Sequence, residues 1–267
     1  MTERLPYVLF ESEPLGTVAK RALSLACYEP AAVISDPKMP QERMLEIIDQ
    51  AQPTFLLVTG FGALLKRELL DTVAGQVLNV HPSLLPLYRG PAPVVQAILD
   101  GITETGVSLM EIDTKMDHGK LLAQESVPLR GNEYPGELYE SLTTKGIHLF
   151  LAHIEAYLND DLEMTPQAHN EATFTHFVKK ADGELDFSEP AELLERKVRA
   201  YSNWPRAFTF VHGKRMIIDT ARVSDGTFLP LTVQPEGGKR MPFDEYLRGQ
   251  RMTEEAFLRT VKGSQKV

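Results

Sequence analysis

The chain of 267 residues is poor in cysteine and tryptophan and has one of each. A single cysteine, Cys27, excludes an internal disulfide framework and is typical of proteins that fold in a reducing compartment. Because Cys27 follows an apolar helical stretch, we expect a small core residue and not a nucleophile. The rest of the composition, 43% hydrophobic and 24% charged, is that of a soluble globular protein.

Long apolar runs are also missing. No stretch approaches the roughly 20 apolar residues that a membrane-spanning helix needs. The first residues, MTERLPYVLFESE, carry an acidic side chain at once and lack the basic and then apolar regions of a secretion signal. We therefore expect a cytoplasmic protein that does not enter a membrane.

A third absence is a glycine-rich phosphate loop. The first predicted strand, residues 5–10, is followed by Glu11-Ser12-Glu13-Pro14. Acidic side chains repel a pyrophosphate, and the backbone N–H cradle of a dinucleotide site needs glycines here. The sequence therefore argues against a nicotinamide cofactor.

Short, continuous apolar runs alternate with stretches of helical spacing. Strands buried on both faces have this appearance, which is typical of a parallel sheet covered by helices. The pattern predicts an α/β domain with a doubly wound, mostly parallel sheet. The expected strands are residues 5–10, 31–35, 54–59, 76–80, 105–112 and 121–127, and the main helices are 16–28, 40–51, 134–158 and 191–201.

The charge balance divides the chain. From Pro205 onward there are 11 Lys and Arg against 7 Asp and Glu, whereas the first 204 residues carry 17 against 30. Such an asymmetry indicates a polyanion-binding module, although a basic solvated face is the simpler alternative. We predict a catalytic domain at 1–190, a helical linker at 191–204 and a small β-rich domain at 205–267.

Candidate catalytic residues end the fourth strand. Asn79 and His81 are two apart, so they project from the same face, and Pro82 keeps His81 extended. Asp117 lies in a loop between two predicted strands, where Gly119 permits a tight turn. A carboxylate near His81 would orient the ring and stabilise its cationic form.

An amide donor, an imidazole and a carboxylate suit acyl transfer to an amine, in which an oxyanion develops and a proton is lost. A structural histidine at a strand end is the competing interpretation of Asn79 and His81 alone. A metal site is disfavoured, because no second histidine falls at ligand spacing.

The stretch NVHPSLLPLYRGPAPVVQAILDGITETGVSLMEIDTKMDHGKLL resembles the signature region of the 10-formyltetrahydrofolate-dependent formyltransferases. The resemblance implies that Asn79, His81 and Asp117 are catalytic and that 10-formyltetrahydrofolate is the formyl donor, without a metal. It implies contacts to the acceptor from Arg89 and Gly90, although Arg89 could instead shape its loop. The folate contacts that it implies are Phe61, Gly62, Ser83, Leu84, Leu85, Pro86 and Asp113.

Residues 181–215 are similar to the segment of methionyl-tRNA formyltransferases that leads into an OB-like C-terminal barrel. This similarity implies initiator methionyl-tRNA as the acceptor, held in part by the basic C-terminal domain. We further expect a monomer.

Two departures from the family pattern concern the acceptor. The segment Asp36–Pro40 replaces a longer basic loop, and the C-terminal domain is short for a five-stranded barrel. An amino-sugar nucleotide is therefore the alternative acceptor. A catalytically silent folate- or tRNA-binding module is a third possibility, which the complete Asn-His-Asp set argues against.

Overall fold

The computed structural model describes residues 5–74 and 76–264, and the chain divides into two compact units. The first unit takes the described residues up to Val94, then Thr103–Leu129 and Glu137–His176. The second unit takes Val95–Ile102, Arg130–Gly136 and the described residues from Phe177 onward. The predicted boundaries at residues 190 and 204 stay a prediction, because the two units interleave along the chain.

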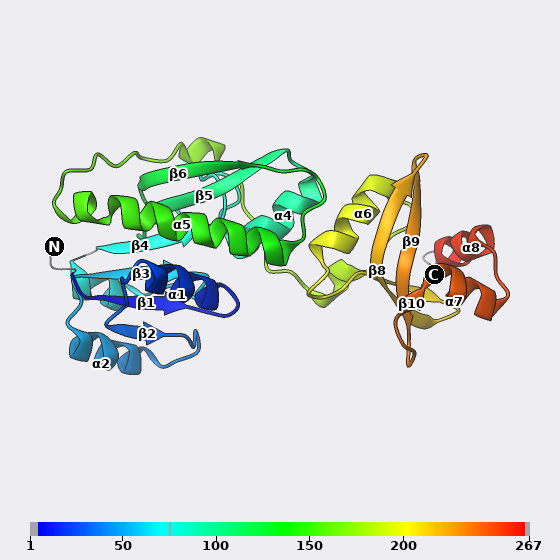
Figure 1. The fold of residues 1–267 in the computed structure, drawn as a ribbon, viewed down its shortest axis with the longest axis horizontal. Helices are drawn as coiled ribbons and strands as arrows, with labels where there is room; N and C mark the ends of the chain where they lie inside the picture. The colour runs from blue at the N-terminus through cyan, green and yellow to red at the C-terminus, as the bar shows by residue number, and fades with distance from the viewer. Residues whose placement is uncertain (1–4, 75, 265–267) are drawn as a thin grey trace. The chain divides into compact units, whose positions relative to one another are not determined.

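A six-stranded sheet forms the centre of the first unit (Figure 1). The strand order is β2-β1-β3-β4-β5-β6, in which the first four strands are parallel and β5 runs antiparallel to both β4 and β6. The predicted α/β fold with a mostly parallel sheet is confirmed. The strands are β1 (Tyr7–Glu11), β2 (Ala32–Ile34), β3 (Phe55–Thr59), β4 (Val77–His81), β5 (Glu104–Glu111) and β6 (Leu121–Pro128).

Helices cover both faces of this sheet. Successive side chains of a strand point to opposite sides, so each strand contributes side chains to the core on either face. Val8 and Phe10 of β1 pack in a core that includes residues of α2 and α3. Tyr7, whose side chain points to the opposite face, contacts the ring of Phe150 from α5, which Figure 1 shows running along the sheet. The helices of this unit are α1 (Leu15–Leu25), α2 (Gln41–Ala51), α3 (Arg67–Leu70) and α5 (Pro135–Leu158), whereas most of α4 (Pro93–Asp100) belongs to the second unit.

The expectation for Cys27 was wrong. Helix α1 ends at Leu25, and Cys27 takes a left-handed backbone conformation with φ 52°. The chain turns there, and Tyr28 enters the core while Cys27 is exposed. The apolar sequence around Cys27 therefore did not predict the orientation of its side chain.

The second unit contains a small antiparallel sheet, as expected, with the strand order β10-β9-β8-β7. Its core combines Leu194 and Val198 of α6 with Val233 of β9 and Phe257 of α8. The elements are α6 (Ala191–Ala200), β7 (Phe208–Val211), β8 (Lys214–Ser224), β9 (Thr227–Pro235), β10 (Met241–Pro242), α7 (Phe243–Gln250) and α8 (Glu254–Ser264).

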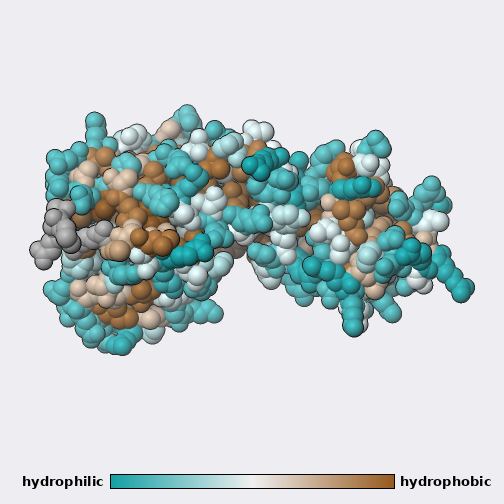
Figure 2. Space-filling view, in the orientation of Figure 1, coloured by the Kyte–Doolittle hydropathy of each residue, from teal (hydrophilic) through white to brown (hydrophobic). Residues whose placement is uncertain are grey.

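The visible surface of the second unit is mostly hydrophilic (Figure 2). Among residues 5–74 and 76–264, no helix has the length and apolarity that crossing a membrane requires.

Candidate active site

Strand β4 places Asn79 and His81 on one side of the sheet. The strand is held between β3 and β5, where Asn79 pairs with Val58 and Met110 and His81 pairs with Ser108. His81 is buried and Asn79 is half-buried. Within the described part of the chain, the Asn79 side-chain amide has no hydrogen-bond partner. The amide is therefore available to a substrate atom.

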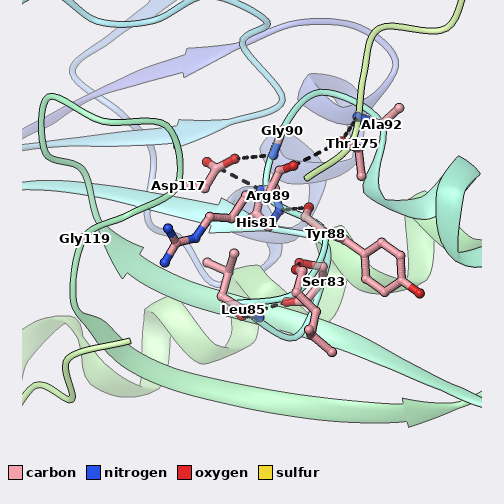
Figure 3. A network of polar contacts seen from close by, with 12 residues as sticks. His81, Ser83, Leu85, Tyr88, Arg89, Gly90, Ala92, Asp117, Gly119 and Thr175 are labelled. Atoms are coloured by element: carbon pink, nitrogen blue, oxygen red, sulfur yellow. Dashed lines mark hydrogen bonds and ion pairs between the residues drawn. The ribbon is translucent and has the colours of Figure 1, made fainter. Parts of the chain in front are cut away.

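The imidazole of His81 lies between Tyr88 and Asp117 (Figure 3). Its Nε2 is 3.1 Å from the carbonyl oxygen of Tyr88, and because a carbonyl only accepts, Nε2–H is the donor. Its Nδ1 is 3.7 Å from Oδ1 of Asp117. This distance is too long for a hydrogen bond but short enough for an ion pair with the protonated ring. Among the residues that the structure describes, Nδ1 has no hydrogen-bond partner at this distance and can therefore take one from a substrate atom.

Asp117 lies in the loop between β5 and β6, and its backbone is left-handed with φ 46°. Its Oδ2 accepts a hydrogen bond of 2.7 Å from the backbone N–H of Gly90. Gly119 has a different role from the expected turn, because a Cβ there would meet the carbonyl oxygen of Glu111 at 2.0 Å. The left-handed residue is thus Asp117 itself, and Gly119 permits a close backbone approach.

A hydroxyl orders the loop that contains Ser83 and Leu85. Ser108 Oγ donates to the carbonyl of Ser83 at 2.6 Å and accepts from the N–H of Leu85 at 3.0 Å. Gln124 Nε2 donates to Ser108 Oγ at 2.8 Å and to the carbonyl of Leu85 at 2.9 Å. Ser83 Oγ donates to the carbonyl of Leu87 at 2.7 Å. The polar atoms of this loop are thereby satisfied from β5 and β6.

The other predicted folate residues differ in accessibility. Leu84 and Pro86 are half-buried, and Leu84 approaches Gly106 closely enough that a Cβ there would lie 2.5 Å from Leu84 Cδ2. Gly62 is exposed. The ring of Phe61 is buried against Phe10, 5.1 Å away edge to face. Their contacts with folate stay predictions.

Asp113 and His118 form a separate pair. Oδ2 of Asp113 is 2.6 Å from Nδ1 of His118, and Oδ1 accepts from the N–H of Lys115 at 2.8 Å. The His118 ring stacks on His169 at 3.9 Å between centroids. Loss of solvation lowers the pKa of His169, and nearby His118, Arg89 and Lys115 lower it further. A guanidinium can only donate, so Nδ1 of His169 is the acceptor of its contact with Arg89.

Arg89 is buried, with 3% of its surface exposed. Its Nε and one terminal nitrogen donate to Oε1 of Gln167 at 3.2 and 2.6 Å, and that terminal nitrogen also reaches Nδ1 of His169 at 3.0 Å. Burial lowers the pKa of Arg89, and the charges of Asp117 and Asp113 partly oppose this effect. Direct contacts of Arg89 and Gly90 with an acceptor stay predictions.

The structure thus brings His81, Asp117 and Gly90 into one network. Sequence reasoning missed Ser108, Gln124 and Gln167, which act through hydrogen bonds to loops far away in the chain. In the described residues, no group of three or more His, Cys, Asp and Glu side chains is arranged to hold a metal ion.

Solved structures with this fold include a methionyl-tRNA formyltransferase from Clostridium thermocellum, with a TM-score of 0.66 and 18% identity, over 86% of this chain and 99% of that one. HypX from Aquifex aeolicus in complex with tetrahydrofolic acid has a TM-score of 0.68 and 18% identity, over 92% of this chain and 47% of that one. The N-formyltransferase from Helicobacter canadensis, in complex with folinic acid and dTDP-3-aminofucose, has a TM-score of 0.60 and 15% identity, over 89% and 100%. At these identities the likeness establishes the fold.

Sequence comparison is more specific. The methionyl-tRNA formyltransferase of Chloroflexus aurantiacus is 40% identical over 231 residues, which are 86% of this chain and 73% of the relative. That of Myxococcus xanthus is 33% identical over 250 residues, 85% of this chain and 80% of the relative. Residues 14–154 match the formyl transferase family and residues 178–229 match its C-terminal domain. The chain therefore belongs to the formyl transferase family, together with these methionyl-tRNA formyltransferases.

Proposed function

We propose that the protein transfers a formyl group from 10-formyltetrahydrofolate to the amino group of methionine on initiator tRNA. The observation that carries this proposal is the His81–Asp117 pair beside the available amide of Asn79, at the end of β4. These groups match the two demands of amine formylation, a donor for the developing oxyanion and a group that handles the proton.

The chemistry is a direct displacement. The amine nitrogen attacks the formyl carbon, and the C–N bond to N10 of the folate breaks as the tetrahedral intermediate collapses. Asn79 donates a hydrogen bond to the oxyanion. The unprotonated Nδ1 of His81 takes the proton that the amine loses, and Nδ1–H then also donates to the oxyanion. The proton lost by the amine ends on N10 of the folate, carried by His81, while Asp117 holds the imidazolium. No covalent intermediate with the protein forms.

The donor assignment is supported by the family and by the loop at Ser83–Pro86. Ser108 and Gln124 fix the backbone of this loop before a ligand arrives. A loop that is already ordered loses less conformational entropy on binding than a mobile one. We assign the folate donor to this loop, with the formyl group directed toward His81.

The acceptor assignment is supported by the methionyl-tRNA formyltransferases at 33–40% identity, whereas the sugar-nucleotide-bound neighbour is 15% identical. Charge in the second unit agrees with it. Lys214 at the start of β8, and Lys239 and Arg240 after β9, are exposed near the same end of the sheet. Phosphates of a tRNA are complementary to such a group.

The test is a competition between acceptors. The full chain is incubated with 10-formyltetrahydrofolate and either methionyl initiator tRNA or dTDP-3-aminofucose, and formylated product is measured by mass spectrometry. We expect formylmethionyl-tRNA, with an affinity that falls as salt rises. Formylation of dTDP-3-aminofucose alone would show that the acceptor is a sugar nucleotide and not the tRNA. The absence of product with both acceptors would contradict the proposed reaction.

A further inference from the structure

Residues 165–175, which we call the strap, connect the two loops of the candidate active site. Thr165 exchanges backbone hydrogen bonds with Leu121, next to the Asp117 loop. At its other end, Arg89 donates from its N–H to the carbonyl of Thr173 at 2.9 Å and accepts from the N–H of Thr175 at 2.7 Å. The strap therefore contacts the chain next to the Asp117 loop at one end and the loop that contains Arg89 at the other.

Gln167 is a strap residue whose side chain forms hydrogen bonds with both loops. It is buried, and its Nε2 donates to the carbonyl of Asp117 at 3.0 Å and to that of Gly119 at 2.7 Å. Its Oε1 accepts both hydrogen bonds from Arg89. A primary amide offers two donors and one acceptor, and this site uses all three functions.

The backbone that Gln167 holds is one that needs support. Asp117 has a positive φ of 46°, which is uncommon outside glycine although aspartate adopts it more readily than most residues, so surrounding contacts help to select it. This conformation directs one carboxylate oxygen to the N–H of Gly90 and the other toward His81. The two hydrogen bonds from Gln167 are the side-chain contacts that fix the Asp117 and Gly119 carbonyls.

Arg89 holds Gln167 in turn. Among the described residues, its guanidinium forms no ion pair within 4.0 Å, and its side-chain partners are Gln167 and His169, both in the strap. A guanidinium donates in a fixed fork, so it orients the Gln167 amide with its NH2 group toward the two carbonyls. The side chain of Arg89 thus faces the strap.

We propose that Gln167, oriented by Arg89, is a positioning residue that holds Asp117 against His81 for formyl transfer. This inference rests on the proposed function for its catalytic consequence. The positioning itself concerns the free protein, so it can be measured separately.

The test uses two substitutions of Gln167 and a matched control. Gln167→Leu removes all three hydrogen-bonding functions. Gln167→Glu keeps an oxygen for Arg89 but turns a second oxygen toward the two carbonyls. We expect both to lower kcat by about 10- to 100-fold, with the KM values for donor and acceptor nearly unchanged. Gln96→Leu, which removes an amide that bonds Asp100 in α4, should leave kcat unchanged.

A double-mutant cycle separates positioning from a structural role. In an Asp117→Asn background, measured by single turnover, Gln167→Leu should cause little further loss, because its effect passes through Asp117. Equal losses in both backgrounds would overturn the proposal. A Gln167→Glu variant with wild-type kcat would also overturn the proposal, because the contact with Arg89 would then be the only one of Gln167's contacts that matters for turnover.

A readout without substrate distinguishes failure of this inference from failure of the proposed function. The N–H of Gly90 is bonded to the Asp117 carboxylate, so its hydrogen exchange reports the position of that side chain. Gln167→Leu and Gln167→Glu should accelerate this exchange at least tenfold more than the exchange of backbone amides in β1 and β3, which report any general loss of stability. Unchanged exchange in both variants would refute positioning, whatever the acceptor proves to be.

Discussion

The carbonyl oxygen of Tyr88 accepts a hydrogen bond from Nε2 of His81, and Tyr88 takes a left-handed conformation with φ 58° in the loop where it does so. A positive φ is disfavoured for an aromatic residue and more strongly for a β-branched one. The backbone of Tyr88 is therefore part of the support of the imidazole.

This relationship predicts a difference between two substitutions that both remove the aromatic ring. Asparagine tolerates positive φ, whereas valine does not. We expect Tyr88→Val to lower kcat by about tenfold more than Tyr88→Asn, because the carbonyl turns away from His81. Steady-state kinetics of the two variants measure this, and equal kcat values would show that the backbone at Tyr88 has no catalytic effect.

Removal of the Asn79 amide should strongly reduce turnover. Loss of one oxyanion donor typically lowers kcat by about 100- to 1,000-fold. We expect this loss for Asn79→Ala, with little change in the KM for the folate donor, because the oxyanion exists only near the transition state. Asn159→Ala, at an exposed position after α5, is the matched control. Near-normal kcat in Asn79→Ala would remove Asn79 from the mechanism.

Ser108 should act on donor binding. Ser108→Ala leaves the N–H of Leu85 and the carbonyl of Ser83 without their partner, so the loop loses its preformed shape. An unsatisfied buried polar group costs about 1–3 kcal/mol. We expect the Kd for 10-formyltetrahydrofolate to rise roughly tenfold. Isothermal titration tests this against Ser126→Ala, an exposed serine of β6, and equal affinities would separate this loop from folate binding.

The second unit should lose stability in acid through Asp219. Its carboxylate loses solvation on burial, which opposes ionisation, but hydrogen bonds from Arg240 and Arg206 outweigh this and lower its pKa below 3.8. A depressed carboxyl pKa contributes stability that is fully present above the unfolded value and is lost as the pH falls through the folded value.

We therefore expect Asp219→Asn to lower the melting temperature at pH 7, and the difference from wild type to shrink progressively below about pH 4. Thermal unfolding followed by circular dichroism across this range measures the effect. Asp225→Asn, in the exposed β8–β9 turn, should differ little from wild type at any pH. A difference for Asp219→Asn that stayed constant from pH 7 to 3 would exclude the ionic contribution.

The apolar runs predicted the strands well, because residues 54–59 and 76–80 are buried on both faces and this burial is visible as continuous hydrophobicity. The projection of Asn79 and His81 from the same face followed from the two-residue period of a strand. The approach of Asp117 to His81 was expected from the family resemblance and is not given by topology alone. Strand β5 runs antiparallel to β4 and ends beside Leu78, so the loop with Asp117 starts at the opposite end of β4 from His81.

Other features leave no local pattern. Arg89 and Gln167 are 78 positions apart, and Gln167 lies in an irregular segment with neither helical nor strand periodicity. Asp117 forms hydrogen bonds with Gln167 and Gly90, which are distant in the sequence, so the surroundings of Asp117 cannot be read from its own segment. The exposure of Cys27 likewise follows from where α1 stops.

The strap also limits where residues can be inserted into the chain or deleted from it. Irregular segments are usually the places where insertions, deletions and affinity tags are accepted. Between Thr165 and Thr175, however, both ends are anchored by backbone hydrogen bonds and Gln167 must arrive opposite Asp117. A single inserted codon here would shift that amide away from its partners. The stretch that looks most permissive in the sequence should therefore be among the least permissive for length.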